Sequence, residues 1–93
     1  MEFKASHILV RDLATADKLY LRIRGGENFE SLARQYSTCP SKSKGGDLGW
    51  FKEGQMVPPF ENAVRRMGMG TISKPVRTQF GYHIIKKTGA SIT

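Results

Sequence analysis

The chain has 93 residues, of which 39% are hydrophobic and 25% are charged, and this ordinary globular composition is not that of a disordered or a membrane protein. Its longest apolar runs, such as residues 8–10, are far shorter than the ~18 residues that span a bilayer, and the start does not resemble a secretory signal. Fifteen basic and eight acidic residues give a formal net charge of +7, but the basic residues are scattered, as is typical of a solvated surface.

The cysteine and histidine content limits the possible chemistry. Cys39 is the single cysteine, so no internal disulfide can form and a cytoplasmic location is expected, with a processed, exported form as the alternative. One cysteine and two histidines, His7 and His83, give at most three soft ligands at wide sequence spacing. A metal site needs several ligands close together, so no metal is predicted.

The first part of the chain predicts a strand followed by two helices. Side chains alternate over residues 3–10, which places Phe3 and His7 on one face of a strand. Apolar residues at helical spacing predict a helix that begins near Thr15 and stops at the glycine pair 25–26. Asn28 is a suitable N-cap for a second helix, which we expect to end near Ser37.

The rest of the chain predicts a loop, three strands and a third helix. Residues 38–46 read as an ordered or partly helical loop, and residues 48–51 as a short strand. The proline pair 58–59 starts a helix expected to end near Gly68, followed by an edge strand over 71–76 and a last strand over 82–87. This order favours an α+β domain with a small, mostly antiparallel sheet covered by helices.

Four sequence blocks carry a resemblance to a known family. They are, in order, residues 6–10 (SHILV), 45–51 (GGDLGWF), 54–60 (GQMVPPF) and 80–85 (FGYHII). Together they resemble the parvulin class of peptidyl-prolyl cis/trans isomerases from end to end. The resemblance implies one domain over residues 1–93 with a parvulin-like fold of the FKBP-like superfold. Its four-stranded sheet would be covered by about four helices, with the first and last strands side by side at the centre.

The activity implied by the resemblance is rotation about X-Pro peptide bonds in client proteins, without a cofactor. Such rotation crosses a barrier of ~18–20 kcal/mol, and no bond is made or broken. A catalyst therefore has to bind the twisted peptide better than either planar form. This requires an apolar pocket for the proline ring and a few well-placed hydrogen bonds.

The resemblance also implies the site. Leu48, Met56 and Phe60 match the family's proline-binding cleft, and Gln55 matches a position on its rim. In the floor of the groove, His7 and His83 would form a hydrogen-bonded pair, since facing residues on neighbouring antiparallel strands have Cβ atoms ~4.5–5.5 Å apart.

Two more residues complete the implied catalytic set. Thr78 would lie beside the histidine pair and Cys39 across from it. Two roles stay open for His7 and His83: they could fix the groove's geometry and the polarity of Cys39, or exchange a proton with the substrate.

The same residues leave other functions and partners open. A nucleic-acid-binding module is the alternative from another class, supported by the net charge of +7 and by Trp50, Phe51 and Phe80 as stacking residues. A non-catalytic peptide-binding module and a thiol hydrolase built on Cys39 are further alternatives. We expect a monomer that binds proline-containing segments of client proteins, with no membrane and no specific nucleic acid.

Substrate choice is predicted from the connection after the first strand. Phospho-specific parvulins carry a long basic loop there, where Lys and Arg side chains clamp a phosphate. Here only residues 11–14 separate the expected strand and helix, and Arg11 is their single basic residue. The resemblance therefore implies an isomerase that does not require phosphate.

Overall fold

The computed structural model describes residues 1–92. The elements in chain order are β1 (Glu2–Val10), α1 (Leu13–Arg24), α2 (Phe29–Tyr36), the 3-10 helix η1 (Pro40–Lys44), β2 (Asp47–Lys52), α3 (Pro58–Arg66), β3 (Val76–Thr78) and β4 (Gly81–Ser91). The strands form one antiparallel sheet in the order β2-β1-β4-β3. The first and last strands are therefore central neighbours, as expected, and the helix count agrees with the expected number.

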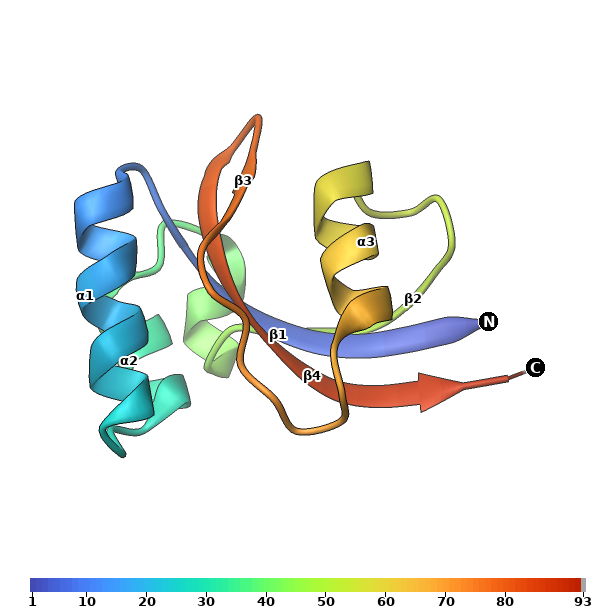
Figure 1. Ribbon diagram of the computed structural model, residues 1–93, viewed down its shortest axis with the longest axis horizontal. Helices are drawn as coiled ribbons and strands as arrows, with labels where there is room; N and C mark the ends of the chain where they lie inside the picture. The colour runs from blue at the N-terminus through green and yellow to red at the C-terminus, as the bar shows by residue number, and fades with distance from the viewer. Residues whose placement is uncertain (93) are drawn as a thin grey trace.

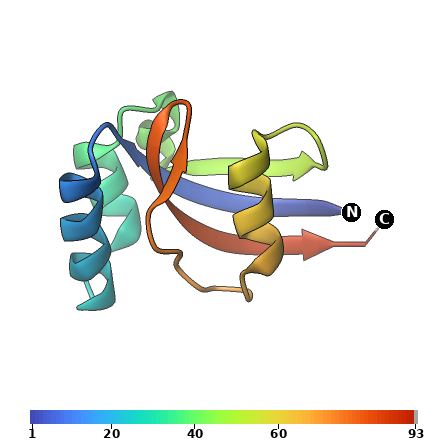
Figure 2. The same ribbon diagram turned by 45° about the horizontal axis from the view of Figure 1, so that its top comes forward.

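The core consists of two apolar clusters on opposite faces of the sheet. Ile8, Val10 and Ile84 pack with the apolar side chains of α1 and α2. Phe3, Ala5 and Ile85 pack instead with α3 and Phe51. Figures 1 and 2 show this arrangement, with α1 and α2 at one end of the twisted sheet and α3 across its other half.

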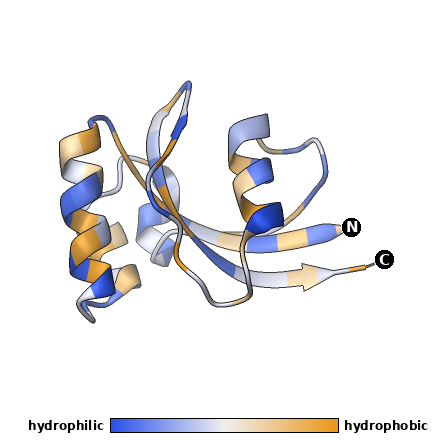
Figure 3. Ribbon diagram, in the orientation of Figure 1, coloured by the Kyte–Doolittle hydropathy of each residue, from blue (hydrophilic) through white to orange (hydrophobic). Residues whose placement is uncertain are grey.

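Both faces of the central strands are covered where their short apolar runs lie, over residues 8–10 at the end of β1 and residues 84–85 in β4. The hydropathy colouring shows mixed character along the rest of both strands, and α1 alternates between apolar and polar residues (Figure 3). No helix within residues 1–92 has the length and apolar character needed to cross a bilayer.

Side-chain caps define where the first two helices begin. The Asp12 carboxylate accepts the Thr15 N–H at 2.9 Å, so α1 begins at Leu13, two residues before the predicted start at Thr15. The connection from β1 to α1 is therefore only two residues long. The Asn28 side chain accepts the Ser31 N–H at 2.8 Å, which confirms the predicted cap of α2.

The prediction of an edge strand over residues 71–76 is wrong. Before Val76, Ile72 forms an isolated bridge to β4, and the continuous edge strand is residues 76–78. The Ser73 hydroxyl accepts the Ile85 N–H at 2.9 Å, in place of a backbone carbonyl, and Pro75 has no N–H to donate. A side chain and a proline thus interrupt the ladder that the apolar pattern predicted.

Two other boundaries differ from the predictions. Helix α3 ends at Arg66, because Met67 has extended backbone angles and caps the helix, rather than continuing to Gly68. Strand β4 runs four residues beyond Lys87, because its far end pairs with the start of β1.

Candidate active site

The two histidines come together through the register of the central strands. The pairing places Leu9 opposite His83 and His7 opposite Ile85, so the histidines are diagonal neighbours rather than the facing residues expected from the sequence. Their Nδ1 atoms lie 2.8 Å apart, within hydrogen-bond distance. Both side chains are buried, with 5% and 4% of their surface exposed, so the pair lies within the domain and not on a solvated strand.

Hydrogen bonds connect the histidine pair to Thr78, and the protons on the two imidazoles depend on the role of its hydroxyl. The Thr78 hydroxyl accepts the Phe80 N–H at 3.1 Å and lies 2.7 Å from His83 Nε2. If Thr78 donates to His83 Nε2, both roles of its hydroxyl are used and His83 Nδ1–H donates to His7 Nδ1. The proton of His7 is then on Nε2, a buried atom with no partner among residues 1–92.

Both imidazoles are neutral near pH 7. Burial, and then the nearby charge of His83, lowers the pKa of His7 to about 4. Burial likewise lowers the pKa of His83 to about 4. The pair therefore supplies fixed hydrogen-bonding groups without adding a charge to the site.

An apolar wall stands against the histidine pair. The Phe60 ring meets the His7 ring at 82° with centroids 5.8 Å apart, and the His83 ring at 75° with centroids 5.4 Å apart. These edge-to-face contacts fix the orientation of both imidazoles. Leu48 and Met56 pack against the same cluster and are half-buried, so part of each side chain stays accessible to a ligand.

The chain matches a known protein family over most of its length. A family model described as a rotamase, PPIC-type PPIase domain, matches residues 10–89. The chain belongs to this family. It is a peptidyl-prolyl cis/trans isomerase domain of the parvulin type.

Individual relatives show how far the similarity extends. The foldase protein PrsA of Bacillus subtilis is 56% identical over 88 residues, which are 94% of this chain and 30% of PrsA. The chain thus spans about a third of the length of the curated relatives that it matches. The crystal structure of PrsA from Bacillus anthracis has a TM-score of 0.94 at 50% identity, covering 95% of this chain and 41% of that one.

A single-domain parvulin gives a comparison over almost its whole length. The solution structure of NmPin from Nitrosopumilus maritimus has a TM-score of 0.83 at 42% identity, and the match covers 95% of this chain and 96% of NmPin. This isomerase domain and NmPin therefore share their fold over nearly the whole of both chains.

Gln55, predicted on the rim of the cleft, is exposed in the loop between β2 and α3. Its side-chain oxygen accepts the Lys52 N–H at 2.6 Å, so the oxygen closes the turn of its own loop. The amide NH2 group has no protein partner in the described chain and is the part of Gln55 that a substrate could reach.

Cys39 is half-buried directly before η1. Its N–H donates to the Ser37 hydroxyl at 3.4 Å, but its thiol forms no hydrogen bond with His7, His83 or any other part of residues 1–92. The structure therefore does not assemble the thiol–imidazole pair that a hydrolase needs. In the same range, no group of three His, Cys, Asp or Glu residues is placed to hold a metal ion.

Two residues that organise the site were not predicted for this role from the sequence. Ser37 is buried, and its hydroxyl also accepts the Leu9 N–H at 3.0 Å, which ties the segment of Cys39 to β1. Phe51 supports the Phe60 ring, with centroids 6.0 Å apart. Phe51 could have been found from its place in an alternating strand, whereas a serine after a helix carries no such signal.

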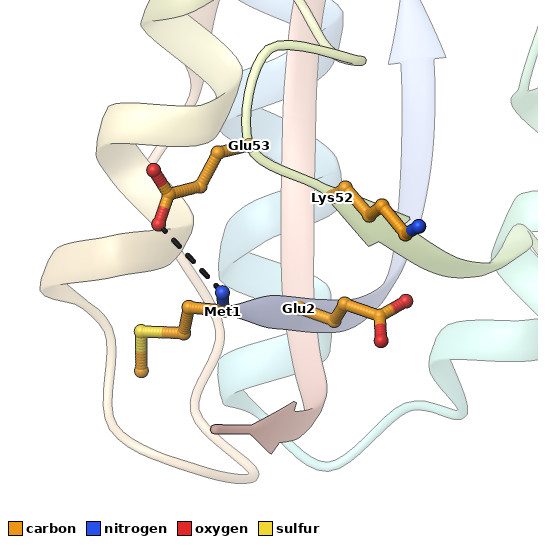
Figure 4. A pocket seen from close by; sticks show the side chains of 4 residues that line it. All are labelled: Met1, Glu2, Lys52 and Glu53. Carbon is orange, nitrogen blue, oxygen red and sulfur yellow. Dashed lines mark ion pairs between the residues drawn. The ribbon is translucent and has the colours of Figure 1, made fainter. Parts of the chain in front are cut away.

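A separate hollow lies at the other end of β1. It is lined by Met1, Glu2, Lys52 and Glu53, and the Met1 amino group lies 3.9 Å from the Glu53 carboxylate (Figure 4). Met1 is six residues from His7 on an extended strand, which corresponds to ~20 Å. This polar hollow is therefore distinct from the histidine site.

Proposed function

We propose that this domain catalyses cis/trans rotation of X-Pro bonds in extended segments of client proteins and does not require phosphate. The observation that carries the proposal is the neutral His7–His83 pair against the Phe60 ring. Such a site offers hydrogen-bonding groups in an apolar setting, with no charged nucleophile and no bond-breaking machinery. It suits a reaction that changes only conformation.

The chemistry follows from the electronic structure of the amide. Conjugation gives the planar peptide bond its double-bond character, and the conjugation is lost as the bond twists. Leu48 and Met56 would hold the proline ring by apolar contact, since a flexible thioether adapts to its shape. With the ring held, hydrogen bonds that are best aligned with the twisted peptide lower the barrier by about 1.4 kcal/mol for each tenfold gain in rate.

The names of relatives support a role in protein folding. Several PrsA relatives are named foldases. PEB4 and Cj1289 of Campylobacter jejuni are described as SurA-like chaperones, and a structure reported for them has a TM-score of 0.89 at 38% identity to this chain. By analogy, proline-containing segments of client proteins are the proposed substrates.

Location and oligomeric state are part of the proposal. The cytoplasmic location and the monomeric state predicted from the sequence remain predictions. Cj1289 of Campylobacter jejuni is described as a periplasmic protein, which makes an extracytoplasmic location the competing prediction.

Exchange spectroscopy on short X-Pro peptides tests the activity directly. We expect catalytic amounts of the domain to speed up exchange between the cis and trans signals, equally in the presence of EDTA. Unchanged exchange rates at equimolar protein would refute the proposal. Chemical-shift changes in the peptide without faster exchange would favour a non-catalytic peptide-binding module instead.

A further inference from the structure

The loop between β2 and α3, residues 53–57, carries Gln55 and Met56, two of the residues proposed to contact substrate. Within the loop, the Gln55 N–H donates to the Lys52 carbonyl at 3.2 Å, in addition to the side-chain bond described above. These bonds shape the turn internally. They do not fix its position relative to α3, which supplies the Phe60 wall.

Glu61 connects the loop to the helix. One of its carboxylate oxygens accepts a hydrogen bond from the Gly54 N–H at 2.7 Å. The other accepts a hydrogen bond from Arg65 Nη2 at 2.9 Å. The Glu61 side chain is only 12% exposed, whereas Arg65 is 42% exposed. Glu61 is therefore the sheltered centre of the cluster, with one bond to the loop and one to its own helix.

The hydrogen bonds to its carboxylate favour the ionised form of Glu61. Its hydrogen bond from the Gly54 N–H, followed by that from Arg65, lowers its pKa below the usual range. Arg65 also reaches Glu53 at the start of the loop, with Nη2 3.1 Å from the Glu53 carboxylate. The position of Glu61 in the first turn of α3 adds a favourable interaction with the helix dipole.

The connection matters because Glu61 directly follows Phe60. The Phe60 side chain faces the histidines, and Met56 packs against the same apolar cluster from the loop. A bond from Glu61 to Gly54 therefore joins the residue next to the aromatic wall to a backbone group two residues before Met56. This bond limits how far Met56 can move from Phe60.

We infer that Glu61 is a positioning residue for isomerisation, which holds the 53–57 loop against α3 and so sets the spacing of Met56 from Phe60. The inference rests on the proposed function, since that function makes Met56 and Phe60 two sides of the proline pocket. Glu61 acts through the loop and has no contact with the reacting peptide bond.

Three substitutions separate the reach of the side chain from its charge. Glu61→Gln keeps an oxygen that can accept the Gly54 N–H but loses the charge. Glu61→Asp keeps the charge in the first turn but is shorter by about 1.5 Å, and so cannot span to Gly54. Glu61→Ala removes both properties.

The expected order of activity depends on whether the side chain at position 61 is long enough to accept the Gly54 N–H. Small displacements of positioned groups cost as much as ~100-fold in rate. We therefore expect kcat/KM to fall by about tenfold in the Asp and Ala variants, mostly through a higher KM. The Gln variant should keep most of the parent's kcat/KM. Glu30→Ala is the matched control, since Glu30 is also in the first turn of a helix and pairs with a basic side chain, Lys86, at 3.4 Å. This control should keep the parent's kcat/KM.

The ¹³C methyl signal of Met56 gives a readout that does not depend on activity. It should shift and narrow in the Asp variant, as the loop gains freedom, and stay near the parent position in the Gln variant. Thermal unfolding of each variant shows whether it is folded at the assay temperature. If the Ala variant is unfolded, the comparison of Asp with Gln decides the question.

The outcomes distinguish the two proposals. A parent domain that is active, with an Asp variant that matches it in kcat/KM and in the Met56 signal, would overturn the positioning role and leave the proposed function intact. An Asp variant with reduced stability but with the parent's kcat/KM and Met56 signal would also overturn the positioning role. A parent domain without activity would overturn both.

Discussion

The two histidines would each titrate near pH 6.5 in an unfolded chain, but the folded domain holds the pKa of each at about 4. Between these values the unfolded chain binds more protons than the native state, so stability rises with pH. The contribution of each histidine to the free energy of unfolding is fully present above about pH 6.5. This contribution is lost as the pH falls to about 4. A buried pair thus makes the domain sensitive to mild acid.

We therefore expect the free energy of unfolding, measured with urea, to fall steadily from pH 6.5 to pH 5. Asp12, Glu27 and Glu61 do not account for a change in this window, because hydrogen bonds hold the pKa of each below its ordinary value. NMR titration of the two imidazoles provides the control. A stability that is constant over this range, or imidazoles that titrate near 6.5 in the native state, would contradict the prediction.

A second prediction compares Phe60 with Cys39. Phe60→Ala removes a ring that is 2% exposed and touches both imidazoles, so it should lower the free energy of unfolding by ~3–5 kcal/mol and strongly reduce kcat/KM. Cys39→Ser should keep most of the activity, since the thiol takes part in no hydrogen bond that the hydroxyl would lose. Activity is measured only after circular dichroism shows that each variant is folded. A serine variant without any activity, together with a trapped thioester on the parent, would favour the hydrolase alternative.

At the scale of elements, we expect the short connection between β1 and α1 to limit any preference for phosphorylated substrates. Only Arg11 and Asp12 lie between the two elements, and Asp12 is occupied with capping the helix. A hundredfold preference for a phosphopeptide requires about 2.7 kcal/mol, whereas one exposed ion pair supplies ~0–1 kcal/mol. One exposed arginine is not sufficient for such a preference.

We accordingly expect similar kcat/KM values for matched Ser-Pro and phosphoserine-Pro peptides, with apolar, acidic and basic residues before proline all accepted. Arg11→Ala should change these values little at physiological salt. A gain of a hundredfold or more on phosphorylation would show that the short connection does not limit selectivity in this way.

Elements governed by local signals could be predicted from the sequence, and those governed by pairing could not. The caps and apolar stripes of α1 and α2 are local, so these helices were predicted to within two residues. The edge strand was misplaced because Ser73 bonds to β4 through its side chain, which an apolar pattern cannot show. The histidine pair came from the family resemblance, while its diagonal geometry depends on a register that only the structure gives.

At the scale of the whole molecule, the two exposed aromatic residues considered for stacking, Trp50 and Phe80, lie at opposite edges of the sheet. Trp50 lies on β2 and is 52% exposed, and Phe80 lies directly after β3 and is 59% exposed. Since β2 and β3 are the two edges of the sheet, these rings cannot form one stacking platform. Phe51, the third aromatic considered for stacking, is buried in the core.

Binding to nucleic acid should consequently be weak and due to net charge alone. Fluorescence anisotropy with labelled single-stranded oligonucleotides should show a steep loss of affinity between about 50 and about 200 mM salt, with no preference for sequence. Replacing Trp50 with Ala should not change the affinity measurably. Tight, sequence-dependent binding at the higher salt would instead favour the nucleic-acid-binding module.

The pairing of Glu2 with Ser91 places the start of β1 beside the end of β4, as Figure 1 shows. A host polypeptide interrupted by such a unit would leave and re-enter at almost the same point, so its own fold would not be stretched. We therefore expect this arrangement of strand ends to be compatible with insertion into chains of different architecture.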